Sequence, residues 1–330
     1  MRNNRLSLKA LIVPSIPLAI LIVSACFLLW VLSFIQLQLS SSESLSLDIF
    51  QKNIIENTLL INLLNFIISL FNAFLLVQLN NKFTIIKTRT FFPVLIYLIL
   101  IGTWSLTHLH TSVHIILSLF IFLVFFLFDM YRDKNAVEQS FLIGLVIGIC
   151  SIIFNPFLLF IPLIWFAYIM FQTLSLRTFL ASIFGVLSCW LMYISVSYFF
   201  IKNFSLYNIL TIHPNLSFEI IELSIPTLIY ISTITLTSII SIIGMYSNFH
   251  IDAIHTRTKL NFFVLVLISV SLLTLFFWSD FIYFLPIIGC VYAILVSHAF
   301  TLKQNKFFSI LFIIFCIVNL AYAITSFISF

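Results

Sequence analysis

"INLLNFIISLFNAFLLVQLN", residues 61–80, is a run without a single charged side chain. A helix needs about 20 predominantly apolar residues to cross the hydrocarbon core of a bilayer, so this run predicts a transmembrane helix. The rest of the chain has the same character. Of its 330 residues, 62% are hydrophobic and 8% are charged, and the mean hydropathy is +1.23. A soluble surface needs far more charge than this, so the sequence predicts an integral membrane protein.

Apolar runs of similar length follow one another along the whole chain. No long polar stretch separates them, so we expect a single integral membrane domain over residues 1–330. The apolar run from Ala10 to about Ile35 is too long for the core of a signal peptide and predicts a retained first helix. The fold class is therefore an all-α, polytopic helix bundle with about eleven spans, expected near residues 10–36, 54–79, 91–106, 114–131, 139–154, 157–175, 179–201, 225–246, 262–279, 282–300 and 307–326.

The lysines and arginines predict the orientation of these spans, because such residues are held on the cytoplasmic side of a membrane. If the N-terminus is cytoplasmic, thirteen of the fifteen fall in inner segments, and only Lys52 and Lys202 fall outside. No other assignment approaches this asymmetry. The net charge of +5 is then an orientation signal and not an indication of nucleic-acid binding.

The sequence offers little support for several classes of chemistry. The five cysteines all lie in apolar runs and none forms a CxxC pair, so we expect no disulfide or zinc framework. P-loop, dinucleotide-binding, HExxH and GxSxG patterns are missing. We therefore predict no metal and no cofactor.

Three histidines stand close together in "THLHTSVH", residues 107–114. The predicted topology places this stretch in the short outer connection between the third and fourth spans. The simplest interpretation is that polar residues end two helices at the water boundary. A metal site and substrate contact are the alternatives, and in the second case His108 and His110 are candidate substrate-binding residues.

Acidic residues near the first outer segment are the candidates for acid–base chemistry. Glu43 and Asp48 are either solvated loop residues or general bases at the membrane surface. Glu56 stands at the mouth of the second span, where an ionisable group is costly unless it faces a partner or a cavity. Asn62 and Asn65 follow on one helix face and either form interhelical hydrogen bonds or line a polar cavity with Glu56.

The order of features from the second to the seventh span resembles an uncharacterised bacterial multi-pass family, a domain of unknown function. The stretches that carry the resemblance are residues 61–100 and 140–190. The anchors are mostly structural residues: Arg89, Pro93, Gly144, Gly148, Asn155, Pro156, Pro162, Arg177 and Gly185.

The same order is also similar to the membrane region of C-type glycosyltransferases, which use polyprenyl-phosphate sugars. Their first outer loop carries an acidic Asp-Ile-Trp-Asp-like segment. Residues 48–50 read Asp-Ile-Phe, and Gln51 and Lys52 stand where the second acid would be. The resemblance implies an enzyme at the outer face of the bacterial inner membrane, with Asp48 as base and Glu43 beside it. Lys52 and Lys202, as the outer cations, would then meet the lipid-linked phosphate.

Two further functions remain open on the sequence alone. A transporter or flippase would need polar groups within spans, and its candidates, Asn62, Asn65, residues 232–238 and Asn319, are uncharged. A scaffold or assembly subunit would need only helix packing. The expected partners are membrane lipids and a polyprenyl-phosphate sugar. Nucleic acid is not expected, and the sequence identifies no protein partner.

Overall fold

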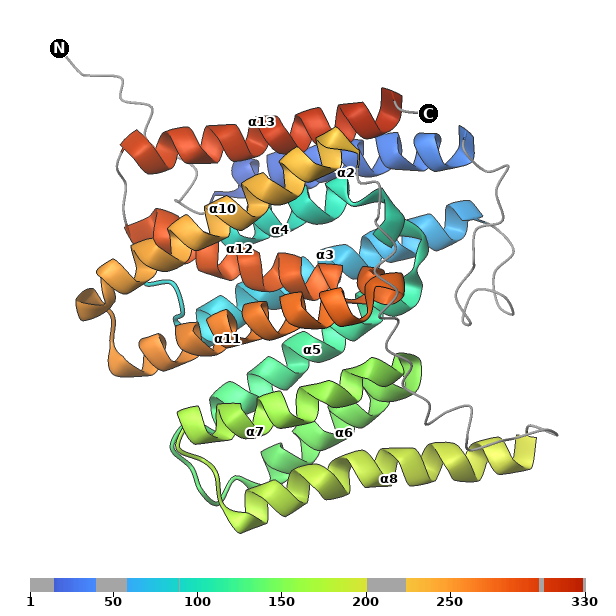
Figure 1. Ribbon diagram of the computed structural model, residues 1–330, viewed down its shortest axis with the longest axis vertical. Coiled ribbons are helices and arrows are strands. Elements are labelled where there is room, and N and C mark those ends of the chain that lie inside the picture. The colour runs from blue at the N-terminus through green and yellow to red at the C-terminus, as the bar shows by residue number, and fades with distance from the viewer. Residues whose placement is uncertain (1–14, 40–57, 89, 201–223, 303–305, 329–330) are drawn as a thin grey trace. The chain divides into compact units, whose positions relative to one another are not determined.

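The computed structural model describes residues 15–39, 58–88, 90–200, 224–302 and 306–328, and within these ranges it contains helices and no strand (Figure 1). The α-helices are α2 (Ile16–Leu39), α3 (Thr58–Phe83), α4 (Phe92–Thr103), α5 (Thr111–Asp129), α6 (Val137–Ile153), α7 (Phe160–Met170), α8 (Leu176–Phe200), α10 (Ile225–Ser247), α11 (Ile254–Phe276), α12 (Leu285–Leu302) and α13 (Lys306–Ile328). Short 3-10 helices are η1 (Ser105–Leu109), η2 (Asn155–Leu159), η3 (Phe249–Ile251) and η4 (Trp278–Tyr283).

Each expected span corresponds to one of these α-helices, but their lengths differ. In the described ranges, seven helices are long and apolar enough to cross a membrane: α3, α5, α8, α10, α11, α12 and α13. The apolar parts of α2, α4, α6 and α7 are shorter. The helices therefore indicate a multi-pass membrane protein, while the count of about eleven spans and the cytoplasmic N-terminus stay predictions.

The chain divides into two compact units, and the division falls within α5 and within α11. Unit 1 comprises residues 1–114, 218–267 and 285–330. Unit 2 comprises residues 115–217 and 268–284. The single domain expected from the sequence stays a prediction.

The centre of unit 1 is formed by α4 and α12. α4 packs against α2, α3, α12 and α13, and α12 also packs against α10 (Figure 1). Nearly every side chain of these two central helices is buried. A helix that is apolar on all sides belongs in the interior, which explains why α4 and α12 take the central places.

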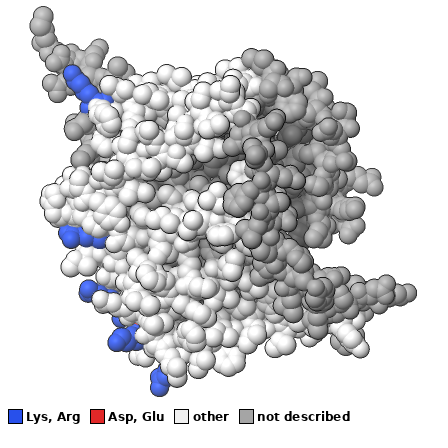
Figure 2. Space-filling model, in the orientation of Figure 1, with Lys and Arg blue, Asp and Glu red and all other residues white. Residues whose placement is uncertain are grey.

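The outer helices expose apolar rather than charged side chains. Large exposed hydrophobic residues recur along α8, α10 and α13. Figure 2 shows a face whose described residues are almost entirely uncharged, broken by small patches of lysine and arginine. Such a surface suits contact with lipid tails and not with water.

Unit 2 contains the tightest helix pair, α6 against α8. Gly144 and Gly148 of α6 face Gly185 of α8. A Cβ atom at Gly144 would clash with the backbone oxygen of Ser182, and one at Gly148 would lie 2.7 Å from the Cβ of Cys189. Small residues that let helix backbones approach closely are the usual means of joining helices in membranes. The glycine anchors noted in the sequence are therefore contact points between α6 and α8.

Replacing Gly144 or Gly185 by alanine should push α6 and α8 apart, because the new methyl group would meet backbone atoms that cannot rotate away. Overpacking of this kind costs roughly 1–3 kcal/mol. We expect a lower thermal unfolding midpoint for each variant in detergent. Gly244→Ala in α10 is the matched control, since its Cβ would meet the tip of the Phe308 ring at 3.3 Å. Equal midpoints for all three variants would contradict the close-contact interpretation.

Candidate functional site

Asp252 is the most unusual side chain in unit 1. It lies directly after η3 and shortly before α11 begins. Its side chain is 0% exposed. In the described ranges it is the one aspartate or glutamate that is buried. Moving a carboxylate away from water is expensive, so its surroundings need an explanation.

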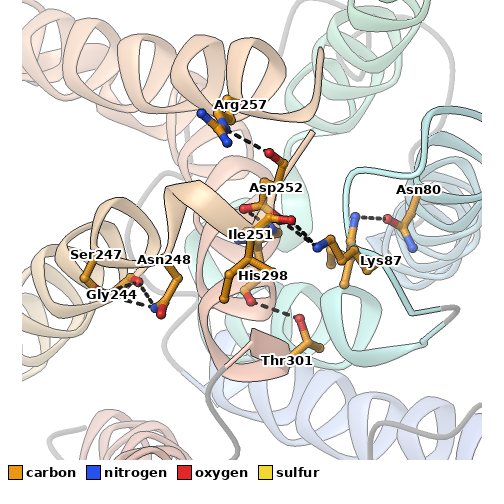
Figure 3. A network of polar contacts seen from close by, with 11 residues as sticks. Asn80, Lys87, Gly244, Ser247, Asn248, Ile251, Asp252, Arg257, His298 and Thr301 are labelled. Carbon is orange, nitrogen blue, oxygen red and sulfur yellow. Dashed lines mark hydrogen bonds and ion pairs between the residues drawn. The ribbon is translucent and has the colours of Figure 1, made fainter. Parts of the chain in front are cut away.

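Two basic side chains from other segments of unit 1 face this carboxylate (Figure 3). His298 of α12, itself 1% exposed, places Nε2 3.4 Å from Asp252 Oδ2. Lys87, from the segment between α3 and α4, places Nζ 3.8 Å from Oδ1. These three residues, Asp252, His298 and Lys87, form what we call the Asp252 cluster.

Further contacts fix the backbone beneath the cluster. Arg257 Nε donates a hydrogen bond to the Asp252 carbonyl oxygen at 2.8 Å, and Lys87 Nζ donates to the Ile251 carbonyl oxygen. Lys259, almost fully buried, donates to the Phe83 carbonyl oxygen at 3.2 Å. Two of these hydrogen bonds connect the loop that carries Asp252 to α11 and to the segment between α3 and α4. The third connects α11 to the end of α3.

The contact between Asp252 Oδ2 and His298 Nε2 is long for a hydrogen bond. Asp252 Oδ1 and His298 Nδ1 have no hydrogen-bond partner among the described residues. Lys87 is 49% exposed, so the cluster touches the protein surface at its lysine. The cluster thus joins a buried carboxylate to a buried imidazole and to an ammonium group that reaches the surface.

The cluster does not have the composition of a metal site. In the described part of the chain, no group of three or more His, Cys, Asp or Glu side chains is arranged to hold a metal ion.

Five of the seven site residues expected from the sequence, Glu43, Asp48, Lys52, Glu56 and Lys202, lie outside the described residues. The other two, His108 and His110, lie in unit 1 at the connection from α4 to α5. The structure therefore does not test whether these seven residues form one site.

His108 is buried among α2, α3 and α4, and His110 is half-buried. The His108 ring stacks on Trp30 with centroids 3.6 Å apart, and its Nε2 lies 2.7 Å from the Ile101 carbonyl oxygen. His114 is buried too, with Nε2 3.1 Å from the Thr107 carbonyl oxygen. His108 and His114 are therefore covered by protein, and the expectation that this connection lies at the water boundary stays a prediction.

The break in the helix explains this burial. Between α4 and α5 the chain leaves regular helix, which frees backbone carbonyl groups inside an apolar bundle. Each freed group needs a donor from the protein. His108 and His114 occupy these positions, and the side chain of Asn65 donates to the His108 carbonyl oxygen at 2.7 Å.

The expected interhelical hydrogen bonds of α3 are confirmed. Trp30 Nε1 of α2 donates to Asn62 Oδ1, and Asn72 Nδ2 donates to the His114 carbonyl oxygen at 3.1 Å. Asn62, Asn65, Ser69 and Asn72 recur on one buried face of α3. This face serves as a row of hydrogen-bonding groups between helices.

Sequence reasoning did not identify Asp252 or His298 as site residues. One signal was available. Asp252 is a lone acid in an otherwise basic connection that also holds Arg257 and Lys259. Its partner His298 is distant in sequence, so only the packing of α12 could reveal the pair.

His108 makes a testable contribution to pH stability. Burial lowers its pKa from 6.5 to about 3, although the hydrogen bond to Ile101 opposes the shift. Because protonation favours the unfolded chain, this contribution is complete above pH 6.5 and is lost as the pH falls from 6.5 towards 3. Between pH 7.5 and pH 5, it should decrease by about 2 kcal/mol.

We expect the thermal midpoint of the purified protein to fall between these pH values, and to fall less in His108→Gln. His250→Gln is the control, because His250 is exposed. A His108→Gln variant with the full wild-type pH dependence would rule out this role.

Comparison with known proteins gives a family but no activity. No curated protein and no solved structure matches the chain significantly, so the similarity to C-type glycosyltransferases finds no support there. A family of unknown function, DUF6427, matches residues 28–329, in agreement with the resemblance to an uncharacterised family. Because the match covers most of the sequence, the chain belongs to the DUF6427 family.

Proposed function

We propose that this protein transports a small solute or lipid across a membrane in a proton-linked reaction, with Asp252 and His298 as the proton-binding pair. One observation carries the proposal: a buried carboxylate lies 3.4 Å from a buried imidazole, and Asp252 Oδ1 and His298 Nδ1 have no hydrogen-bond partner among the described residues. Ionisable residues inside membrane helix bundles commonly mark ion pathways and proton relays.

A purely structural role explains this geometry less well. Buried polar groups that serve stability are normally hydrogen-bonded, and a buried ion pair stabilises a fold only with excellent geometry and satisfied lone pairs. The Asp252 cluster lacks both. It has instead two basic neighbours, the buried His298 and the half-exposed Lys87, which together allow a proton to be held and exchanged.

The cluster also supplies ionisable groups for proton coupling. The polar residues that the sequence offers within the spans are uncharged, which argues against coupling to an ion. The structure adds His298 inside α12 and Asp252 against it. Elsewhere in unit 1, Tyr230 of α10 donates to Asn319 Oδ1 of α13 at 3.1 Å, with Thr103 of α4 beside them. This uncharged trio is our candidate for contact with a polar solute.

The test is proton flux in liposomes that contain the full chain and an internal pH dye. Adding a deproteinated cell extract outside should change the internal pH with the wild type, but not with Asp252→Asn or His298→Gln. The thermal midpoint of purified Asp252→Asn is measured in parallel, because removing one partner of a buried ion pair can destabilise a fold and lost flux counts only for a folded variant.

Asp133→Asn is the control, since Asp133 is an exposed acid. Wild-type liposomes that show no extract-dependent flux would overturn the transport proposal. A clearly destabilised Asp252→Asn variant with normal flux would instead favour a structural ion pair and a scaffold protein.

A second candidate function, a C-type glycosyltransferase-like enzyme that uses polyprenyl-phosphate sugars, is favoured by one feature of unit 1. The acidic segment with Asp48 and Glu43 joins α2 to α3, and these two helices border an apolar groove of about 470 Å³. Such a groove suits a polyprenyl tail. In this proposal Lys52 and Lys202 meet the phosphate, while Glu56, His108 and His110 contact the substrate. The groove is lined by Ala19, Ile20, Val23, Ser24, Phe27 and Phe66.

Mass spectrometry of lipid-linked sugars and surface glycans tests this second candidate. In a deletion strain we expect one polyprenyl-phosphate sugar to accumulate, and we expect the wild-type gene, but not Asp48→Asn, to reverse this. Glu138→Asn is the control acid, because it is exposed and lies in another connection. Unchanged sugars in the deletion strain would dismiss the enzyme, and restoration by Asp48→Asn would dismiss the base.

We further propose that the protein lies in the bacterial inner membrane among membrane lipids, with a cytoplasmic N-terminus. The distribution of cations supports this. In unit 1, Lys87 and Arg257 lie at or next to connections between helices, and in unit 2, Arg132, Lys134 and Arg177 do the same. The N-cytoplasmic topology assigns all of these connections to the inner side.

A further inference from the structure

Unit 2 contains a pocket whose chemistry differs from that of the apolar surface around it. Its volume is about 620 Å³. Two connections form it, one after α5 and one after α7. The lining residues are Arg132, Lys134, Tyr168, Ile169, Gln172 and Leu174.

The two connections are tied to each other by their backbones. Arg132 N–H donates to the Phe171 carbonyl oxygen at 3.1 Å, and Ser175 Oγ donates to the Lys134 carbonyl oxygen at 3.0 Å. Arg132 and Gln172 have φ values of 63° and 58°, a left-handed conformation that is uncommon outside glycine. Both pocket walls are thus held in defined turns, and such backbone conformations cluster at functional sites.

The charge inside the pocket is positive. Arg132 and Lys134 line it, and none of its lining residues is acidic. The acids of the same connection are placed elsewhere: Asp133 Oδ1 accepts the Asn135 backbone N–H at 2.8 Å, and neither Asp129 nor Glu138 lines the pocket. An anionic ligand would therefore meet two cations and the Gln172 amide.

The remaining lining residues add a buried polar group and an apolar border. The Tyr168 hydroxyl is buried beside the Ser140 hydroxyl. Ile169 is 57% exposed and Leu174 is 41% exposed. Apolar side chains at the edge of a basic pocket, at the ends of membrane helices, suit a molecule with an anionic head and an apolar tail.

We propose that this pocket binds the phosphate headgroup of an anionic phospholipid. Arg132 and Lys134 contact the phosphate through charge-assisted hydrogen bonds, Gln172 contacts the polar head, and an acyl chain lies along Ile169 and Leu174. The proposal concerns unit 2 alone and does not depend on the transport or transferase proposals.

Native mass spectrometry of the full chain in detergent tests the proposal. Phosphatidylglycerol, phosphatidylethanolamine and inorganic phosphate are added separately. We expect phosphatidylglycerol to be retained preferentially, and the double variant Arg132→Gln/Lys134→Gln to retain it roughly tenfold less, which corresponds to about 1.4 kcal/mol. The charge-preserving variant Arg132→Lys/Lys134→Arg should retain most of the binding.

Arg177→Gln is the matched control, because it removes one exposed cation from unit 2 without touching the pocket. Equal retention of the two phospholipids would overturn the proposal, as would unchanged phosphatidylglycerol binding in the double variant. Displacement of phosphatidylglycerol by millimolar inorganic phosphate would reassign the pocket to a soluble phosphate and overturn the lipid source. Because both mutated cations are exposed, we expect the double variant to fold, and an unchanged thermal midpoint verifies this.

Discussion

The constraint on which this structure depends is that a polar group buried among apolar helices must find its partner inside the protein. Water supplies partners at the surface of a soluble domain, but hydrocarbon supplies none. In a regular helix the backbone groups bond to one another. At every break in a helix, some backbone carbonyl groups lose these bonds and need a side-chain donor. The connection from α4 to α5 shows this clearly: Asn65 reaches a carbonyl oxygen at 2.7 Å, and His108 places a ring nitrogen 2.7 Å from another.

The same constraint separates two kinds of buried polar residue. Asn62, Asn65 and Asn72 each make a hydrogen bond to a neighbouring segment, so their burial is explained by the packing of α3. Asp252 and His298 are buried to a similar degree, yet Asp252 Oδ1 and His298 Nδ1 have no hydrogen-bond partner among the described residues. Helix packing explains the asparagine face, whereas burying a carboxylate carries a free-energy cost that packing alone does not explain.

The sequence predicts the helices well because the signal lies within each segment. Length and hydropathy predict an apolar run at each α-helix of the described residues, and the asparagines of α3 indicate interhelical hydrogen bonds. Helix length is harder to predict, because it depends on where the chain breaks inside the bundle. The break at Trp104–His110 shortens α4 to Phe92–Thr103 and turns two expected boundary histidines inward. Hydropathy averaged over a window cannot distinguish a polar residue at the water boundary from one that serves a buried break.

The Asp252 cluster was beyond the reach of sequence reasoning for a different reason. Its members come from three segments that are distant along the chain, and each alone has an ordinary explanation: a loop acid, an interfacial histidine and a cytoplasmic lysine. Their significance arises only when α12 places His298 3.4 Å from Asp252, while Lys87 lies 3.8 Å from the same carboxylate. The same charged residue types orient a membrane protein in the bilayer and perform its chemistry. Burial distinguishes them: Arg177 is exposed and needs only an orienting role, whereas the Asp252 side chain is 0% exposed and its position has to be explained by what it binds.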